Sequence, residues 1–184
     1  GPSGAGKNSV IERVMQILPG LSYSVSYTTR PRRSNEVNGR DYYYITHQEF
    51  DRLVSEGEMV EHVTYLGDQY GTSRAQICEV FSREKDVILN IDVEGAKALK
   101  GSGLLDFSVV YVFLTPSSLA ILGERLRIRG TEDEEEIRAR LTVAAQEMET
   151  LPLFDYLVVN DELDIAVDEL RSIIVAERSR ILHG

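Results

Sequence analysis

The chain begins with a glycine-rich loop that ends in a lysine, Gly1-Pro2-Ser3-Gly4-Ala5-Gly6-Lys7, and a segment with helical periodicity follows it. Glycines allow successive backbone N–H groups to turn toward one point, and the positive end of the following helix faces the same point. Lys7 adds a full positive charge. A loop of this type joins a buried strand to a helix, so it predicts an α/β fold and a nucleoside triphosphate as ligand.

The residue after the lysine departs from the usual pattern, which has serine or threonine there. This chain has Asn8, followed by Ser9. Asn8 could offer its side-chain oxygen to Mg²⁺ or to one of the waters of the metal. A turn and helix start without a ligand is the alternative interpretation. We expect the triphosphate at Gly1, Ser3, Gly4, Ala5, Gly6, Lys7, Asn8 and Ser9.

Composition restricts the class of protein. The 184 residues are enough for one principal domain with insertions. The single cysteine, Cys78, excludes an intrachain disulfide and suits a reducing compartment. The longest apolar run, at 109–114, is too short to span a bilayer. We therefore expect a soluble cytoplasmic protein that does not bind membranes.

The number and distribution of charged residues restrict the classes of ligand further. The net charge of −10 argues against a protein that coats nucleic acid. Most basic residues are nonetheless arginines, which favour bidentate contacts with phosphate. They gather in two clusters, Arg30/Arg32/Arg33/Arg40 and Arg125/Arg127/Arg129 with Arg138/Arg140. Each cluster by itself could also be a solvated basic loop.

Strand-like and helix-like segments alternate in a way that predicts a P-loop NTPase-type parallel sheet flanked by helices. Buried-strand runs occur at 87–92, 109–114 and 156–159, and helical patterns at 7–18, 94–101, 117–127, 134–149 and 163–181. The acidic run at 132–136 fits the first turn of a helix. A P-loop is expected to follow a buried strand, so we expect the first core strand to be missing before Gly1.

The sequence pattern changes between residues 28 and 82, where short strand-like segments of polar and aromatic residues replace the apolar runs. We expect strands at 42–45, 59–65 and 70–72 and a helix at 47–56. The patterns Thr46-x-x-Glu49 and Ser73-x-x-Gln76 are each typical of a helix start. This segment is predicted to be an inserted mixed α+β subdomain.

Four motifs in this order closely resemble guanylate kinase: residues 24–33, residues 36–42, Tyr70-Gly71-Thr72 and Arg129-Gly130-Thr131. The resemblance covers essentially the whole chain. It implies one domain over 1–184, with a core of 1–27, 83–126 and 146–184, a GMP-binding subdomain at 28–82 and a lid at 127–145. The chain departs from the family pattern at Asn8 and at Asn90, where a carboxylate is common.

The resemblance implies a site for GMP as acceptor. Its phosphate is expected at Arg30, Arg33, Tyr42 and Tyr70, and its guanine at Ser26, Glu61 and Thr72. The hydrogen-bonding groups of guanine agree with this assignment, because a carboxylate such as that of Glu61 can accept hydrogen bonds from both the N1–H and the N2–H₂ groups of the base. Adenine would leave the carboxylate unpaired at a cost of about 1–3 kcal/mol. Asp92 matches a position near the acceptor and the metal, which it would reach through a water, with a helix cap as the alternative.

The resemblance also implies residues that act in catalysis and a residue that lies near the adenine of ATP. Arg125, Arg129 and Arg140 fall in and around the lid segment and are expected to neutralise charge on the transferred phosphoryl group. Asn160 matches a segment near the adenine site, with a turn or helix cap as alternative. The three histidines are isolated and are expected to be structural or surface residues: His47, His62 and His183.

The function implied is transfer of the γ-phosphoryl group of ATP to GMP in purine nucleotide metabolism, with Mg²⁺ on the ATP, by a monomer or homodimer. A related P-loop kinase for a phosphorylated ribose is one alternative, which the guanine-reading residues disfavour. A catalytically weak or inactive guanylate-kinase-like binding module is the other. The intact Gly1–Lys7 loop disfavours that module, whereas Asn8 and the missing strand favour it.

Overall fold

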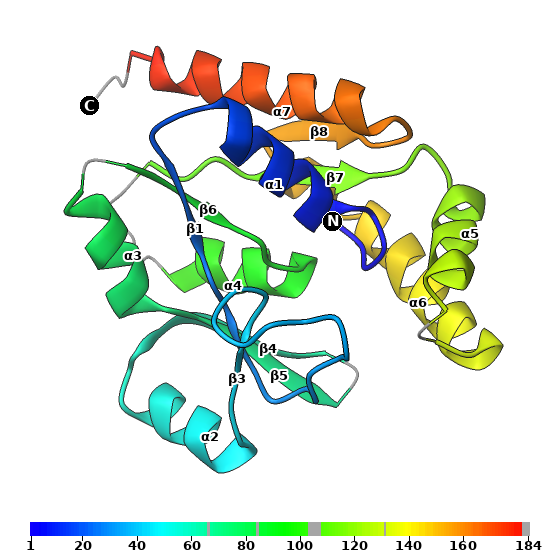
Figure 1. Ribbon diagram of the computed structural model, residues 1–184, viewed down its shortest axis with the longest axis horizontal. Coiled ribbons are helices and arrows are strands. Elements are labelled where there is room, and N and C mark those ends of the chain that lie inside the picture. Colours follow the sequence, from blue (N-terminus) through cyan, green and yellow to red (C-terminus); the bar gives the residue numbers. More distant parts are fainter. Residues whose placement is uncertain (66, 84, 103–107, 131, 182–184) are drawn as a thin grey trace. The chain divides into compact units, whose positions relative to one another are not determined.

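A computed structural model describes residues 1–65, 67–83, 85–102, 108–130 and 132–181. Helices and strands alternate along these residues (Figure 1). The chain divides into two compact units, which we call unit 1 (Gly1–Pro19 and Val110–Gly184) and unit 2 (Gly20–Val109). None of the helices in the described residues combines the length and the apolar character that crossing a bilayer requires.

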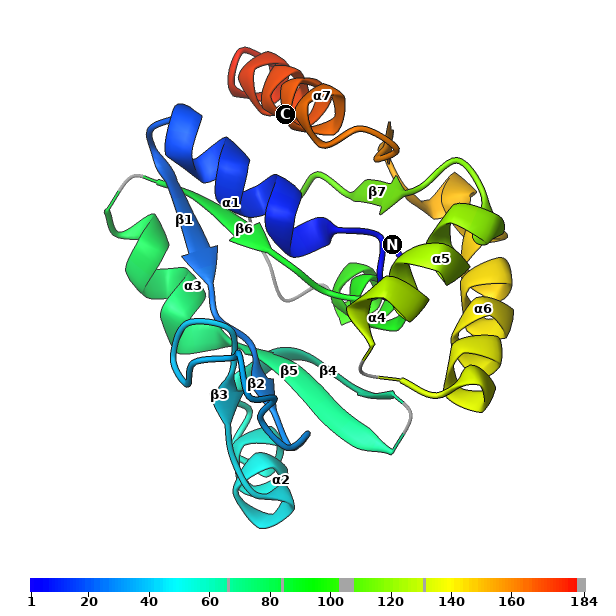
Figure 2. The same cartoon turned by 45° about the vertical axis from the view of Figure 1, so that its right-hand side comes forward.

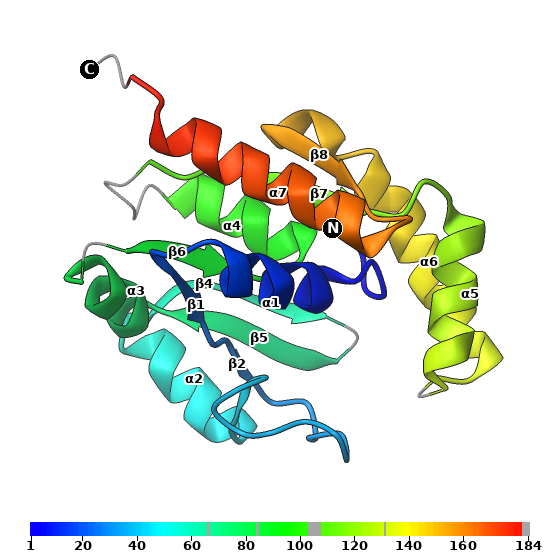
Figure 3. The ribbon, with the colours of Figure 1, turned by 45° about the horizontal axis from the view of Figure 1, so that its top comes forward.

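Unit 1 is built on two parallel strands, β7 (Val112–Thr115) and β8 (Tyr156–Val159). Helices α1 (Lys7–Ile17) and α7 (Leu163–Arg178) pack against each other (Figure 3). Helices α5 (Leu119–Arg129) and α6 (Glu134–Met148) form a second pair, and the short 3₁₀ helix η1 (Leu151–Leu153) leads into β8. Their shared apolar core consists of Leu122, Leu126, Ile137 and Ala144, with Leu141 packed against it.

The start of α6 confirms the interpretation of the acidic run. Asp133 accepts hydrogen bonds from the N–H groups of Glu135 and Glu136, and the Glu136 carboxylate accepts the Asp133 N–H in return. This capping box satisfies donors that a helix start leaves without partners. The acidic side chains also lie at the positive end of the helix dipole.

Two elements of unit 1 begin later than the sequence predicts. The strand expected at 109–114 lies at Val112–Thr115, because its pairing with β8 begins opposite Tyr156. The helix expected at 117–127 lies at Leu119–Arg129, because Ser118 is its N-cap and accepts the Ile121 N–H. Caps and strand partners fix these ends, and apolar periodicity alone does not reveal them.

Unit 2 contains a parallel pair, β1 (Leu21–Ser24) with β6 (Asp86–Leu89), and a four-stranded mixed sheet (Figure 2). The sheet runs in the order β3 (Tyr43–Tyr44), β2 (Tyr27–Thr28), β5 (Asp68–Ser73) and β4 (Met59–Tyr65). Strand β2 is parallel to β3 and antiparallel to β5, and β4 is antiparallel to β5. Strand β5 therefore lies inside the sheet and can carry residues toward both of its neighbours.

Three helices complete unit 2: α2 (His47–Ser55), α3 (Arg74–Phe81) and α4 (Val93–Ser102). Thr46 caps α2 by accepting the Glu49 N–H, as its sequence pattern predicts. Ser73 is the N-cap of α3, as its sequence pattern predicts, although its side chain makes no capping hydrogen bond. The Gln76 side chain accepts a hydrogen bond from Ser24 at 3.4 Å.

The architecture confirms the predicted class: parallel strand pairs flanked by helices, with a mixed α+β segment between β1 and α3. The subdomain bounds 28–82 and 127–145 stay predictions. The helix expected at 163–181 ends at Arg178, and the strand expected at 87–92 ends at Leu89, where its pairing with β1 stops.

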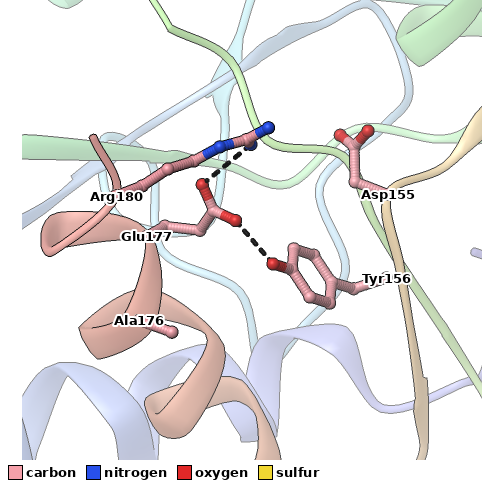
Figure 4. A pocket seen from close by; sticks show the side chains of 5 residues that line it. All are labelled: Asp155, Tyr156, Ala176, Glu177 and Arg180. Atoms are coloured by element: carbon pink, nitrogen blue, oxygen red, sulfur yellow. Dashed lines mark hydrogen bonds and ion pairs between the residues drawn. The ribbon is translucent and has the colours of Figure 1, made fainter. Parts of the chain in front are cut away.

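A pocket of about 510 Å³ opens between β8 and the end of α7 (Figure 4). Its lining consists of Asp155, Tyr156, Ala176, Glu177 and Arg180. The Tyr156 hydroxyl donates to the Glu177 carboxylate at 2.5 Å, and Arg180 pairs with the same carboxylate at 3.3 Å. The hydrogen bond from Tyr156 lowers the pKa of Glu177. The hydrogen bond between Tyr156 and Glu177 thus joins β8 to α7.

Candidate functional site

The glycine-rich loop of unit 1 has the backbone conformation that its glycines allow. Gly4 and Gly6 have φ angles of 88° and 89°, in the left-handed region, and Gly6 is the N-cap of α1. A side chain at Gly6 would also collide with the amide of Asn160. The Lys7 ammonium donates to the carbonyls of Gly1 at 2.6 Å and Pro2 at 3.0 Å, so it lies over the loop.

Side chains from distant segments support this loop. Asn160, which follows β8 and is buried, donates its amide N–H to the Ala5 carbonyl at 2.7 Å. Arg140, from α6, donates to the Ser3 hydroxyl at 3.0 Å. The structure thus brings two of the predicted residues, Arg140 and Asn160, to the loop that the sequence predicts for phosphate.

Two of the predicted catalytic arginines share one carboxylate, that of Glu132. The Glu132 side chain is 2% exposed. Arg129 donates to both of its oxygens, through Nε at 3.2 Å and through a second guanidinium nitrogen, and Arg140 lies 3.5 Å from it. The Arg140 Nε is buried and has no hydrogen-bond partner among the described residues. Arg140 therefore has one donor that the described residues do not use.

The other predicted residues of unit 1 have different surroundings. Arg125 donates to the Asp161 carbonyl at 3.1 Å. Hydrogen bonds from Ser117 lower the pKa of Asp161 itself. Asn8 and Ser9 are exposed on the first turn of α1, directly after Lys7. Thr131, part of one motif, lies outside the described residues.

In unit 2 the predicted phosphate-binding residues gather around Glu36. Arg30 pairs with the Glu36 carboxylate at 2.7 Å, and Arg33 lies 3.5 Å from it. The guanidinium of Arg30 stacks over the ring of Tyr42, 5.6 Å from its centroid, and the Tyr42 and Tyr70 rings meet edge to face at 5.9 Å. Burial raises the pKa of Tyr42 and of Tyr70, so both hydroxyls keep their protons as donors.

The predicted guanine-binding residues form a second group, around Glu61. Glu61 is 5% exposed, and the fully buried Thr72 donates its hydroxyl to the Glu61 carboxylate at 2.5 Å. Burial raises the pKa of Glu61 to about 7, and the nearby charge of Asp92 adds to this, against the hydrogen bond from Thr72. Asp92 follows β6 and accepts the Gly95 N–H at 2.7 Å, so it also caps α4.

Gly95 makes room for this pair of acids. A Cβ atom on Gly95 would lie 2.9 Å from a carboxylate oxygen of Glu61 and 3.3 Å from one of Asp92. A larger residue would therefore displace at least one carboxylate.

The sheet of unit 2 explains how the two groups come together. Tyr70 and Thr72 are two residues apart on β5, so they project from the same face about 7 Å apart. Thr72 is opposite Glu61 on β4, and Tyr70 is opposite Thr28 on β2. Ser26 lies buried between β1 and β2, where its carbonyl accepts the Tyr43 N–H. One strand therefore connects a phosphate-binding group to a base-binding group.

The sequence did not single out four residues of these arrangements: Glu36, Tyr44, Gly95 and Glu132. Glu36 and Tyr44 lie in or beside a quoted motif, and Glu132 lies in the acidic run. The position of Glu36 in the sequence could have indicated its role, because a lone acid close to three arginines is expected to pair with one of them. Gly95 has no side chain, and only its surroundings reveal its role.

Metal-binding side chains do not cluster in the described part of the chain, where no three of His, Cys, Asp and Glu meet in a possible metal site. His47 bonds to Gln69 at 2.9 Å, and His62 is exposed on β4. His183 lies outside the described residues. The arrangement offers arginines, a lysine and backbone N–H groups for phosphates, and a buried carboxylate for a base with two donors.

Comparisons with known proteins agree with this chemistry. The family model "Guanylate kinase" matches residues 1–177. The guanylate kinase of Carboxydothermus hydrogenoformans is 40% identical, over 97% of this chain and 86% of its own. That of Thermotoga maritima is 41% identical, over 100% of this chain and 87% of its own. The crystal structure of guanylate kinase from Anaplasma phagocytophilum matches with a TM-score of 0.78 and 30% identity, over 94% of this chain and 81% of that one.

Proposed function

The chain belongs to the guanylate kinase family and transfers a phosphoryl group from ATP to GMP, and we propose how its side chains divide this reaction. Unit 1 holds the residues that we assign to ATP, and unit 2 holds those that we assign to GMP. Phosphoryl transfer needs no covalent intermediate with the protein, so positioning and charge neutralisation supply the catalysis.

For ATP, the backbone N–H groups of residues 1–7 and the start of α1 receive the phosphates, and the Lys7 ammonium leaves the loop carbonyls for a phosphate oxygen. Arg129 and Arg140 neutralise the charge that develops on the transferred group. The unused donor of Arg140 supports this assignment. Asn160 supports the loop through Ala5, and we assign it to the adenine end of ATP. Arg125, which donates to the Asp161 carbonyl, is assigned to charge neutralisation with the other two arginines.

For GMP, Arg30, Arg33, Tyr42 and Tyr70 bind the phosphate. Glu61 accepts the N1–H and N2–H₂ donors of guanine, while Ser26 and Thr72 contribute hydroxyls. The observation that carries this proposal is the buried Glu61 carboxylate with Thr72 on one of its oxygens. A kinase for a phosphorylated ribose has no base to read and no use for such a carboxylate.

Mg²⁺ fits the donor set as an ion that keeps several waters and takes few protein ligands. Asn8, exposed directly after Lys7, would hold it through its side-chain oxygen, and Asp92 is a second candidate through a water. When bound, the ion neutralises charge on the phosphates of ATP. A cytoplasmic location, a monomeric or dimeric state and the lack of nucleic-acid or membrane partners stay predictions.

The direct test is a coupled assay of ADP formation with ATP and Mg²⁺ in which GMP, AMP, CMP, UMP and ribose phosphates are compared as acceptors. We expect turnover with GMP and at least about a hundredfold lower kcat/KM with AMP, since one carboxylate would be left unpaired. Turnover with a ribose phosphate would contradict the assigned acceptor. ATP binding without turnover on any acceptor would favour a binding module.

The raised pKa of Glu61 predicts that GMP binding depends on pH. Guanine donates to the ionised carboxylate, and with a pKa of about 7 the ionised fraction falls about tenfold between pH 8 and pH 6. The affinity for GMP therefore rises with pH through this range, and KM for GMP is expected to be about tenfold higher at pH 6 than at pH 8. Steady-state kinetics at saturating ATP measures this change.

The phosphate of GMP also titrates near pH 6, so the pH profile needs a control. The Glu61→Gln variant keeps the phosphate and lacks the titrating carboxyl. We expect its KM for GMP, although higher, to vary less with pH than that of the wild type. Equal pH profiles in the two proteins would show that Glu61 is not the group responsible.

A further inference from the structure

Glu36 lies at the centre of the phosphate-binding group but is not one of the residues that we assign to a ligand. Its carboxylate accepts Arg30 at 2.7 Å, the backbone N–H of Arg33 at 2.8 Å and the Tyr44 hydroxyl at 2.7 Å. The guanidinium of Arg33 is 3.5 Å away. One carboxylate thus contacts both phosphate-binding arginines and a tyrosine of the neighbouring strand β3.

We propose that Glu36 is a positioning residue for the reaction, which holds Arg30 and Arg33 ready for the phosphate of GMP. This inference rests on the proposed function, because it assigns these arginines to that phosphate. It goes further, since it gives a role to a negative charge beside the site for a negative ligand.

The contacts of Arg30 show how its position is fixed. One of its terminal nitrogens donates to Glu36 and the other to the Pro31 carbonyl at 2.8 Å. Its guanidinium lies over the rings of Tyr42 and Tyr44, at 5.6 Å and 5.8 Å from their centroids. The side chains of Arg30 and Glu36 are each only 12% exposed. A long side chain held in this way loses little further freedom when a ligand arrives.

The loop that carries Arg33 is fixed by the same carboxylate. Glu36 accepts the Arg33 N–H through one oxygen, and its own backbone carbonyl accepts a hydrogen bond from Arg32. Tyr44, on β3, donates to the oxygen that accepts Arg33. Glu36 therefore connects the loop at 30–36 to the sheet.

Two effects of Glu36 on GMP binding have opposite signs. Its negative charge repels the phosphate, so by this effect alone its removal would strengthen binding. Its hydrogen bonds keep two guanidinium groups in place, so by this effect its removal would weaken binding. A guanidinium has five N–H donors, and a bond to Glu36 leaves Arg30 able to bind phosphate as well. Because the Glu36 side chain is only 12% exposed and has several partners, we expect the second effect to prevail.

The charge state of Glu36 supports the same role. Burial opposes ionisation, but the hydrogen bonds from Arg30, from the Arg33 N–H and from Tyr44 lower its pKa to about 2. Glu36 is therefore ionised across the whole range of an enzyme assay. Its effect on GMP binding does not vary with pH between 6 and 8, unlike that of Glu61.

The test is the variant Glu36→Gln, which keeps the shape of the side chain and removes its charge. We expect its KM for GMP to rise about tenfold, the size of one charge-assisted hydrogen bond, by the same factor at pH 6 and pH 8. KM for ATP is expected to stay unchanged. Guanosine, which has no phosphate, is measured as a competitive inhibitor, and we expect it to bind the variant and the wild type equally.

Control variants make the outcome specific. Glu56→Gln removes an exposed carboxylate that pairs with Arg52 in the same unit, and no kinetic parameter is expected to change. Glu36→Asp keeps the charge, and its KM for GMP is expected to lie between those of the wild type and Glu36→Gln. This second variant also serves as the test if the first does not fold.

Three results would overturn the inference. An unchanged or lower KM for GMP in Glu36→Gln would show that repulsion balances or outweighs positioning. Weaker binding of guanosine by the same factor would indicate a general structural role. An equal loss in Glu36→Asp would show that the charge is not what matters. Failure of the wild-type chain to phosphorylate GMP would instead contradict the proposed function, so the two failures are distinguishable.

Discussion

Replacing Lys7 by alanine is expected to lower kcat by about 10²- to 10³-fold, the usual loss when one donor to a developing charge is removed. The Lys7 ammonium is the only full charge on the phosphate loop and lies over its carbonyls at 2.6 Å and 3.0 Å. It is therefore placed to move onto a phosphate oxygen of ATP. Binding of GMP is expected to change little, because the residues assigned to GMP belong to unit 2.

The measurement combines steady-state turnover with equilibrium titration of GMP into each protein. Lys85→Ala, which removes an exposed lysine before β6, is the matched control and is expected to behave like the wild type. Undiminished turnover in Lys7→Ala would refute the role of the loop. Loss of GMP binding along with turnover would indicate that the substitution disturbs the fold.

Replacing Glu61 by glutamine is expected to raise KM for GMP by about 10²-fold, equivalent to about 3 kcal/mol. The amide keeps one oxygen for the Thr72 hydroxyl, but it turns an N–H₂ group toward the two donors of guanine. The preference for GMP over AMP, as a ratio of kcat/KM values, is expected to shrink by a similar factor.

Glu58→Gln provides the control for this variant, because Glu58 is an exposed acid three residues before Glu61. It is expected to keep the KM and the preference of the wild type. If Glu61→Gln discriminates between GMP and AMP as the wild type does, the buried carboxylate does not read the base. A P-loop kinase for an acceptor without a base would then become the better interpretation.

Features that depend on neighbouring residues could be predicted from the sequence. The glycines of the loop take the left-handed conformation that their motif indicates, and the acidic run caps α6. These predictions succeed because a motif or a turn has its own local chemistry, which the rest of the fold does not change.

Contacts between distant residues could not be predicted in the same way. Arg140 and Ser3 are 137 residues apart, and Asn160 and Ala5 are 155 apart, so their hydrogen bonds depend on the packing of α6 and β8. Glu132 was assigned to a helix turn with its acidic neighbours, whereas its side chain is buried between two arginines. Element ends were missed for a related reason, since caps and strand partners decide them.

The two groups of unit 2 also differ in how their residues are distributed along the chain. Arg30, Glu36 and Tyr44 lie within fifteen consecutive positions, whereas Glu61, Thr72 and Gly95 come from two strands and a helix. The phosphate set nevertheless includes Tyr70 and the base set includes Ser26, so the two sets interleave along the chain. Tyr70 and Thr72 both lie on β5, and a register slip of one residue in that strand would turn both side chains to the opposite face of the sheet. Recognition of the phosphate and recognition of the base therefore depend together on the register of a single strand.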